Sequence, residues 1–355
     1  MSDNRRGTVL VTGGAGYVGS HCCKSFAAAG WRVVVLDDLS RGFAEAVKWG
    51  PLVRARIDDR RAVEAALREY QPDLVAHFAA FAYVGESVER PELYYDNNSA
   101  GTLALLEAMR ATDVRRLLFS STCATYGHPT YLPIDEGHPQ RPINPYGWSK
   151  FIIERMLEDY AVAHGFTSTA LRYFNAAGCD PAGEIGENHD PETHVIPLAL
   201  DAALGRGPAF RVNGFDFDTR DGSAIRDYIH VTDLADAHVR AAARLLDTAG
   251  ADIINLGTGT GTSVLELVAA VERATGTPMQ VERGHDGRAI RRCLSRRRRA
   301  RGECWAGSRR IRTSTRSSAP PLPGGSRGPG DPNRSPGADR AERRDRRAAG
   351  RRRGA

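Results

Sequence analysis

The stretch Thr8-Val9-Leu10-Val11-Thr12-Gly13-Gly14-Ala15-Gly16-Tyr17-Val18-Gly19 decides how this 355-residue chain begins to fold. Its first four residues are aliphatic or β-branched and predict a buried strand. Residues 20–29 then predict a helix, and residues 32–36 predict a second strand that ends at Asp37 and Asp38. A strand, a glycine-rich turn, a helix, a strand and an acidic residue follow one another in the order that a dinucleotide site requires.

Each glycine of this turn has a separate physical role. We expect Gly13 to permit the tight turn, Gly16 to let the backbone approach a pyrophosphate, and Gly19 to let the helix close onto the strand. The helix N-terminus would offer N–H groups and its positive dipole to the phosphates. Asp37 would accept the hydroxyls of the adenosine ribose and repel a 2′-phosphate, which favours NAD over NADP.

The chain continues as alternating strands and helices. Helices are predicted at 60–70, 92–111, 150–164, 196–204, 232–246 and 263–275. Strands are predicted at 74–78, 116–120, 168–173, 209–212 and 253–256. This alternation favours an α/β fold with a doubly wound parallel sheet of the Rossmann type, in which ligands bind beyond the carboxyl ends of the strands.

Polar or small residues follow several of the predicted strands. Phe78-Ala79-Ala80 and Ser120-Ser121-Thr122 stand at two such ends, and Asp37 at a third. Thr122 is therefore a candidate hydroxyl in a site at this edge of the sheet. Its alternative role is to form a local turn or to cap a helix.

A tyrosine and a lysine four residues apart, Tyr146 and Lys150, mark the next helix. Residues at this spacing share one helical face. An ammonium held there favours the phenolate and would lower the tyrosine pKa from about 10. The pair is a candidate base for taking a proton from a sugar or alcohol hydroxyl. The alternative is a chance pair on a solvated helix, although the chain has only three lysines.

Composition divides the chain near residue 280. Residues 281–355 hold 23 Arg and 7 acidic residues, a net charge of +16, whereas residues 1–280 hold 26 basic and 36 acidic residues, a net charge of −10. The tail has no apolar periodicity, and its composition predicts disorder. Its arginines favour non-specific contact with nucleic acid or anionic surfaces. No specific nucleic-acid partner is expected, because Trp305 is the only aromatic residue among them.

The cysteines and the apolar runs point to a reduced, cytoplasmic protein. The six cysteines form no CxxC pair and no cysteine–histidine zinc spacing, so we expect free thiols and no metal site. The polar N-terminus predicts no signal peptide. No apolar run approaches the length of a membrane span, so no membrane association is expected.

These residues make the chain similar to the extended short-chain dehydrogenases/reductases, and most closely to the UDP-glucose 4-epimerases. The similarity covers roughly residues 7–283. The glycine turn and the Tyr-x3-Lys pair mark only the superfamily, whereas Val84-Gly85-Glu86-Ser87-Val88 and Arg226–Val231 are more specific to the epimerases. Further similar segments are His77–Ala80, Tyr94–Asn98, Ser120–Gly127, Asn144–Lys150, Leu171–Asn175 and Asn255–Gly257.

The resemblance implies NAD-dependent 4-epimerisation of UDP-glucose and UDP-galactose, a reaction of galactose metabolism. Tyr146, its pKa lowered by Lys150 and the positive nicotinamide, would remove the proton of the sugar 4-hydroxyl while hydride passes from C4 to NAD. The 4-keto sugar would turn over in the site and take the hydride back on its other face. Thr122 would hydrogen-bond the 4-oxygen. Asn175 and Arg226 would hold the UDP diphosphate, where arginine suits bidentate contact.

The predicted site has three sets of residues. The residues predicted to bind NAD are Gly13, Gly16, Tyr17, Val18, Gly19, Asp37, Asp38, Phe78, Ala79, Ala80, Asn97, Tyr146, Lys150 and Phe174. The predicted catalytic residues are Tyr146, Lys150 and Thr122, and the predicted substrate residues are Thr122, Asn175 and Arg226.

One pair of positions separates the chain from related dehydratases, and three other features depart from the family pattern. Related dehydratases carry an Asp-Glu pair after the Ser/Thr, but this chain has Cys123 and Ala124 there, which argues against a dehydratase. Arg56 stands where the family has an aspartate for the adenine amine, and Asp58 is the candidate substitute. A lysine common near the nicotinamide is Ala82 here. The usual uridine-contacting Gly-Asp-Pro motif and closing helix are not in place.

We therefore predict three regions. They are an NAD-binding Rossmann domain at 7–175, a smaller and partly interleaved α/β UDP-sugar region at 176–283, and an Arg/Gly/Pro-rich tail at 284–355 that is either disordered or read in a shifted frame. A homodimer through helices 92–111 and 145–164 is implied by the resemblance. Two alternatives stay open: a 4-epimerase of a UDP-pentose or UDP-N-acetylhexosamine, and an inactive NAD-binding remnant.

Overall fold

The computed structural model describes residues 6–284. The predicted tail, apart from Gly284, and the proposed shift of reading frame lie outside these residues. Seven strands build the central sheet: β1 (Gly7–Thr12), β2 (Trp31–Asp37), β3 (Leu52–Arg54), β4 (Leu74–His77), β5 (Arg116–Thr122), β6 (Thr167–Tyr173) and β11 (Ala251–Leu256).

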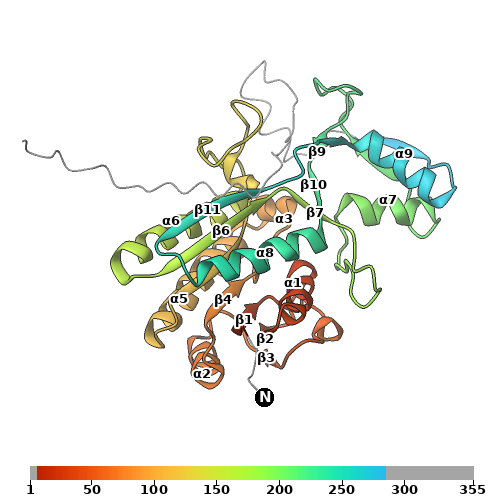
Figure 1. The fold of residues 1–355 in the computed structure, drawn as a ribbon. Helices are drawn as coiled ribbons and strands as arrows, with labels where there is room; N and C mark the ends of the chain where they lie inside the picture. Colours follow the sequence, from red (N-terminus) through yellow and green to blue (C-terminus); the bar gives the residue numbers. More distant parts are fainter. Residues whose placement is uncertain (1–5, 285–355) are drawn as a thin grey trace, which may run out of the picture. The chain divides into compact units, whose positions relative to one another are not determined.

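The order of these strands confirms the predicted doubly wound sheet. It is β11-β6-β5-β4-β1-β2-β3, with every neighbouring pair parallel (Figure 1). The winding direction reverses between β1 and β4. In sheets of this type, ligands bind beside that reversal, outside the carboxyl ends of the strands.

Helices cover both faces of the sheet. They are α1 (Tyr17–Ala28), α2 (Arg60–Tyr70), α3 (Val84–Glu89), α4 (Pro91–Tyr94), α5 (Gly101–Ala111), α6 (Pro145–His164), α7 (Val195–Ala203), α8 (Val231–Leu245) and α9 (Val264–Thr275). A π-helical segment, η2 (Tyr95–Ala100), joins α4 to α5, and short 3₁₀ turns form at η1 (Ala44–Ala46) and η3 (Cys123–Tyr126).

Alternate side chains of each strand enter two separate cores. On one face, Val9 and Val11 of β1 pack in a cluster with residues of α1 and α8. On the other face, Leu10 packs in a cluster with residues of α2, α5 and α6. A strand buried on both faces is apolar along its whole length, and this is why the sequence predicts these strands so directly.

The rest of the described chain forms three small sheets. β7 (Asn175–Ala177) pairs with β10 (Tyr228–His230), β9 (Ile225–Arg226) with β12 (Thr262–Ser263), and β8 (Phe210–Asn213) with β13 (Val281–Gly284). Residues of α7, α9, β8 and β13 form a third core. The chain returns to the central sheet through α8 and β11, and the proposed division at residue 175 stays a prediction.

Most predicted elements are present, with shifts at their ends. The helix predicted at 60–70 has those bounds, and Ser263 and Glu266 form a capping box at the start of α9. The helix expected from residue 150 begins at Pro145 instead. Val162, an apolar residue in the last turn of that helix, is 91% exposed. Within residues 6–284, no helix has the length and apolarity to cross a membrane.

Candidate active site

A cavity of about 1030 Å³ opens where β1, β4 and β5 end. Apart from Asp58, every residue proposed from the sequence for the cofactor, the substrate or the chemistry lines this cavity. The fold thus gathers segments from the glycine turn to Arg226 around one space. The individual roles of these residues remain predictions.

The glycine turn is shaped by two glycines and left open by a third. Gly13 has φ +73°, and a Cβ there would lie 2.4 Å from the Ala79 nitrogen. A Cβ on Gly19 would lie 2.1 Å from the Gly13 carbonyl oxygen, whereas one on Gly16 would meet nothing closer than 3.4 Å. Helix α1 starts after Gly16 with no side-chain cap, so its first N–H groups are free to bind an anion. This open cradle fits a dinucleotide pyrophosphate.

Asp37 ends β2 at the edge of the same cavity. Its carboxylate accepts hydrogen bonds from the Ala15 nitrogen at 3.0 Å and the Leu39 nitrogen at 2.9 Å, and burial raises its pKa. Each carboxylate oxygen keeps a further lone pair for a ribose hydroxyl. Asp38 accepts from the Ser40 nitrogen at 2.8 Å.

At the predicted adenine end of the cavity, the Asp58 carboxylate is already paired with Arg56. Arg56 lines the cavity and holds Asp58 through two hydrogen bonds of 2.9 Å. Asp58 is absent from the lining residues. That Asp58 takes the place of the family's aspartate stays a prediction. The Arg56 guanidinium already binds both oxygens of the Asp58 carboxylate.

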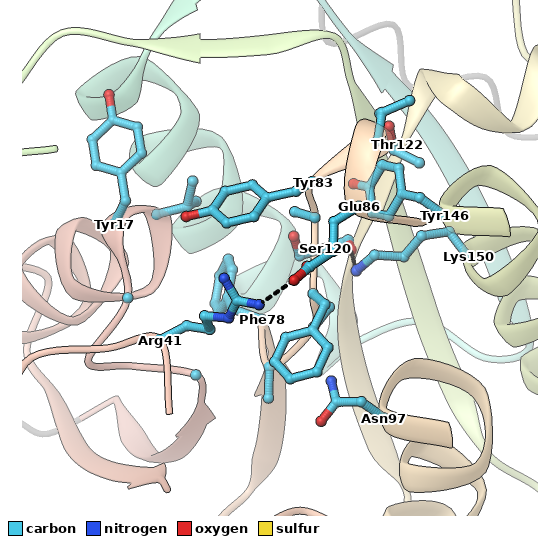
Figure 2. A pocket seen from close by; sticks show the side chains of 18 of the residues that line it. Tyr17, Arg41, Phe78, Tyr83, Glu86, Asn97, Ser120, Thr122, Tyr146 and Lys150 are labelled. Carbon is cyan, nitrogen blue, oxygen red and sulfur yellow. Dashed lines mark hydrogen bonds and ion pairs between the residues drawn. The ribbon is translucent and has the colours of Figure 1, made fainter. Parts of the chain in front are cut away.

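The tyrosine–lysine pair sits in the first turns of α6. The Asn144 side chain accepts from the Gly147 nitrogen at 2.8 Å and caps the helix, and a proline follows at the first helical position. Lys150 is 3% exposed and donates to the Ser120 carbonyl oxygen at 2.8 Å. Figure 2 shows Tyr146 beside Thr122, with the Lys150 amine directed toward Ser120.

Electrostatics in the protein alone differ from the expectation for this pair. Burial raises the pKa of Tyr146 to about 12, against a hydrogen bond with Thr122 that lowers it. Burial lowers the pKa of Lys150 to about 7, against the charge of Glu154. The predicted lowering of the Tyr146 pKa by Lys150 is therefore not realised in the protein alone, because burial disfavours the charged form of both groups.

Thr122 combines both roles that the sequence left open. Its hydroxyl lines the cavity and also accepts from the Ala124 nitrogen at 3.1 Å, capping η3. Cys123 and Ala124 line the cavity where a dehydratase would carry two carboxylates. Burial raises the pKa of the Cys123 thiol, so neither position offers an acid or base at neutral pH.

A buried ion pair fixes α6 against β6. Both oxygens of Glu154 accept from the Arg172 guanidinium, at 2.8 and 2.6 Å, and both side chains are 1% exposed. Ser121 donates to Glu154 at 2.6 Å, and Arg172 donates to the Tyr126 hydroxyl at 2.6 Å. Full pairing of both charges holds the helix that carries Lys150 in one register.

The substrate side rests on short strands. Asn175 donates its amide to the Asp227 carbonyl oxygen at 2.9 Å, and Arg226 donates to the Ile225 carbonyl oxygen at 2.9 Å. The Asp227 carboxylate accepts from the Thr258 hydroxyl at 2.7 Å and ties this strand to the loop after β11. Arg226 keeps further N–H groups for a phosphate.

Several cavity residues were missed from the sequence. Arg41 pairs with Glu86 at 2.6 Å and lies 5.1 Å from the ring centroid of Tyr83 (Figure 2). Ser120 and Tyr173 share a hydrogen bond of 2.6 Å at the cavity wall. Glu86 lies inside the segment Val84–Val88 that resembles the epimerases, so that similarity was the available signal.

Together, a Rossmann-type sheet with an open glycine cradle and a Tyr–Lys pair on the same cavity defines a dinucleotide-dependent enzyme of the short-chain dehydrogenase/reductase class. Residues 9–257 match the NAD dependent epimerase/dehydratase family, and the chain belongs to that family.

Three relatives make the similarity concrete. The UDP-glucose 4-epimerase of Rhizobium meliloti (strain 1021) is 55% identical over 273 residues, which are 77% of this chain and 83% of that protein. The crystal structure of UDP-glucose 4-epimerase from Brucella ovis in complex with NAD matches with a TM-score of 0.77 and 53% identity, over 79% of this chain and 86% of that chain. The enzyme from Bifidobacterium longum in complex with NAD⁺ and UDP matches with a TM-score of 0.76 and 38% identity, over 79% and 86% of the two chains. The predicted resemblance to NAD-dependent epimerases is confirmed.

Proposed function

We propose that this chain is an isomerase that interconverts UDP-glucose and UDP-galactose, with NAD as its cofactor, in galactose metabolism. One observation carries the proposal. Tyr146, Lys150 and Thr122 line the same cavity as the glycine cradle, in a chain of the epimerase family.

The chain's own residues divide the work by position. Gly13, Gly16 and Gly19 with the start of α1 hold the pyrophosphate of NAD, and Asp37 holds its ribose. When bound, NAD supplies an acceptor and donor of hydride for C4 of the sugar.

Tyr146 exchanges the proton of the sugar 4-hydroxyl. Its pKa of about 12 in the protein alone keeps it protonated near neutral pH. Positive charge brought into the cavity favours the phenolate, so ligand binding and activation of this base are coupled. Thr122 orients the 4-oxygen, and Lys150, held by Ser120, keeps its amine on the tyrosine side of the cavity.

Asn175 and Arg226 line the same cavity and hold the diphosphate. Arginine can contact two phosphate oxygens at once. This fixes the nucleotide while the sugar ring presents either face to the cofactor. The same diphosphate contacts suit other UDP-sugars, so the sugar pocket decides between them.

The test is a turnover assay without added NAD. Purified full-length protein is incubated with UDP-galactose, and UDP-glucose is measured by chromatography. Conversion together with NAD released on denaturation supports the proposal. Bound NAD with no conversion supports the inactive remnant instead. Faster conversion of a UDP-pentose or a UDP-N-acetylhexosamine would assign the chain to one of those substrates.

We also propose that two copies associate through η2, α5 and α6. Tyr95, Leu103 and Trp148 on these helices are apolar side chains that stay about two-fifths exposed, at 39%, 41% and 41%. Exposed apolar residues on neighbouring helices favour a helix-to-helix interface. Sedimentation of Leu103→Glu should show a shift from dimer to monomer, while Leu204→Glu, outside these helices, should not change the dimer. A monomeric wild type would contradict this interface.

A further inference from the structure

Four metal-binding side chains gather in the segment that precedes α7. Glu187, His189, Glu192 and His194 each offer one donor atom, and all four atoms lie within 4.8 Å of one another. His189 and His194 line the cavity, and the two carboxylates are not among its lining residues. The cluster therefore stands in the cavity wall.

The separations between these atoms match one coordination geometry. Nδ1 of His194 lies 3.3 Å from Glu187 Oε1 and 3.0 Å from Glu192 Oε1. Nδ1 of His189 lies 3.7 Å from Glu187 Oε1 and 3.5 Å from Glu192 Oε2. A tetrahedron with zinc–nitrogen and zinc–oxygen bonds of about 2.0–2.2 Å has edges of about 3.3–3.6 Å. Two of the four separations fall within that range, and the other two lie just outside it at 3.0 and 3.7 Å. His194 and His189 face different oxygens of Glu192, and one of those oxygens would be the ligand.

Two of the donors have no hydrogen-bond partner, and this independently points to a ligand. Glu187 has only 9% of its side chain exposed, and its Oε1 is buried without a partner. Nδ1 of His189 is likewise buried and makes no hydrogen bond of good geometry, with carboxylate oxygens of Glu192 and Glu187 at 3.5 and 3.7 Å. Leaving buried polar atoms unpaired costs free energy, so native structures rarely contain them. A cation between them would satisfy both lone pairs.

The remaining two donors are already held in place. Glu192 Oε1 accepts from the backbone nitrogens of Thr193 and His194 at 2.8 and 2.7 Å, and it lies 3.0 Å from His194 Nδ1. Hydrogen bonds of this kind orient carboxylate ligands in metal sites. The alternative to a metal between Glu192 and His194 is a proton that these two side chains share.

We propose that Glu187, His189, Glu192 and His194 bind one divalent transition metal of the zinc type, in a tetrahedral site of two nitrogens and two oxygens. Imidazole ligands favour zinc and its neighbours over magnesium or calcium, which take oxygen ligands. Four protein ligands leave no open position, so the site is structural.

The position of the site gives it a role in shaping the cavity. The segment between β7 and α7 is fixed at its beginning by the Tyr17 hydroxyl, which donates to the Gly178 carbonyl oxygen at 2.5 Å, and by Lys24, which pairs with Asp180 at 2.7 Å. A metal at the cluster fixes its other end. The ring centroid of His189 lies 5.9 Å from that of Tyr17 and 6.0 Å from that of Tyr83, so the metal would also steady this aromatic wall.

Titration calorimetry on untagged full-length protein tests the proposal. The protein is stripped with a chelator, dialysed and titrated with Zn²⁺. Because thiolates also bind zinc, every measurement uses a background in which Cys179, Cys293 and Cys304 are serines. The test variant is Glu187→Gln/Glu192→Gln, which keeps the side-chain shapes. The matched control is Glu184→Gln, a carboxylate of the same segment outside the cluster.

The background protein and the Glu184→Gln control should bind one Zn²⁺ per chain. The double variant should bind at least about tenfold more weakly. Co²⁺ bound to the background protein should give the intense visible absorption of a tetrahedral site. Absence of stoichiometric binding overturns the proposal whether or not the double variant folds. Equal loss in Glu184→Gln, or a weak octahedral Co²⁺ spectrum, also overturns it.

Discussion

The two parts of the described chain hold their site residues by different means. Thr122 ends β5 of the seven-stranded sheet, and Tyr146 and Lys150 lie on α6, which packs against that sheet. An apolar core covers each face of the sheet. Asn175 and Arg226 lie on strands of three and two residues, in separate two-stranded sheets. The first set is placed by extensive apolar packing, and the second by a few polar contacts around Asp227. Proton transfer needs sub-ångström placement, whereas a diphosphate with several oxygens tolerates more variation.

The largest expected effect comes from removing the proposed base. Tyr146→Phe keeps the ring but loses the hydroxyl, so turnover of UDP-galactose should fall by about 10²–10⁴-fold. Tyr131→Phe is the control, because Tyr131 is an exposed tyrosine bonded to Asp135. Steady-state rates of both variants decide the matter. Near-normal turnover in Tyr146→Phe would remove this residue from the chemistry and with it the contrast between the two parts.

The next effect tests how strongly the large sheet holds α6. Arg172→Met leaves Glu154 charged and buried without its partner, and should lower the free energy of unfolding by about 3–5 kcal/mol. Arg60→Met breaks the exposed pair with Glu64 on α2 and should cost no more than about 1 kcal/mol. Urea denaturation measures both. Adding Glu154→Gln to Arg172→Met should recover part of the loss, since no buried charge is then left unpaired.

The same division explains what the sequence could predict. The strands of the large sheet are buried on both faces, so Leu10 and Val34 stand in apolar runs that are visible without a structure. Asn144 and Pro145 carry a cap and a first-turn proline, and reading those signals would have placed the start of α6 correctly.

Other features had no local pattern. A strand as short as β9 has too few residues to show a periodicity. Its pairing with β12 also depends on parts of the chain that are distant in sequence. The pKa of Tyr146 depends on burial, and spacing reveals the neighbouring amine but not the loss of solvent. The donors from Glu187 to His194 converge only when their segment folds, so a search for cysteine spacings could not find them.

A further prediction concerns the pH dependence of stability in the large sheet. The pKa of Lys150 falls from 10.5 to about 7 on folding. Between these values the unfolded chain binds a proton that the folded chain does not, so stability rises with pH across this window and the rise is complete near pH 10.5. Below pH 7 both states are protonated, and the buried charge costs its full amount.

Lys150→Met should remove that rise. Urea midpoints measured at pH 7 and pH 10 should show the wild type gaining roughly 3 kcal/mol relative to the variant as the pH increases. The comparison with the variant cancels the other groups that titrate in this range. Parallel pH profiles for the two proteins would mean that Lys150 stays charged in the folded protein. The Ser120 carbonyl and the Phe119 ring, 4.8 Å from the amine, would then stabilise that charge more than burial opposes it.

The smallest expected effect asks whether the two parts unfold together. Ser263 caps α9 in the small-sheet part, and Asp59 caps α2 beside the large sheet, each accepting from a backbone nitrogen at 3.1 Å. Asp59→Ala should cost about 1 kcal/mol, and Ser263→Ala about 2 kcal/mol because Ser263 is buried in a capping box. If the parts form one cooperative unit, both variants shift a single urea transition seen by fluorescence and by far-UV circular dichroism. If Ser263→Ala instead separates an early transition while Asp59→Ala moves only the later one, the small sheets unfold alone. The substrate end of the cavity would then be the less stable end, as its short strands and few polar contacts suggest.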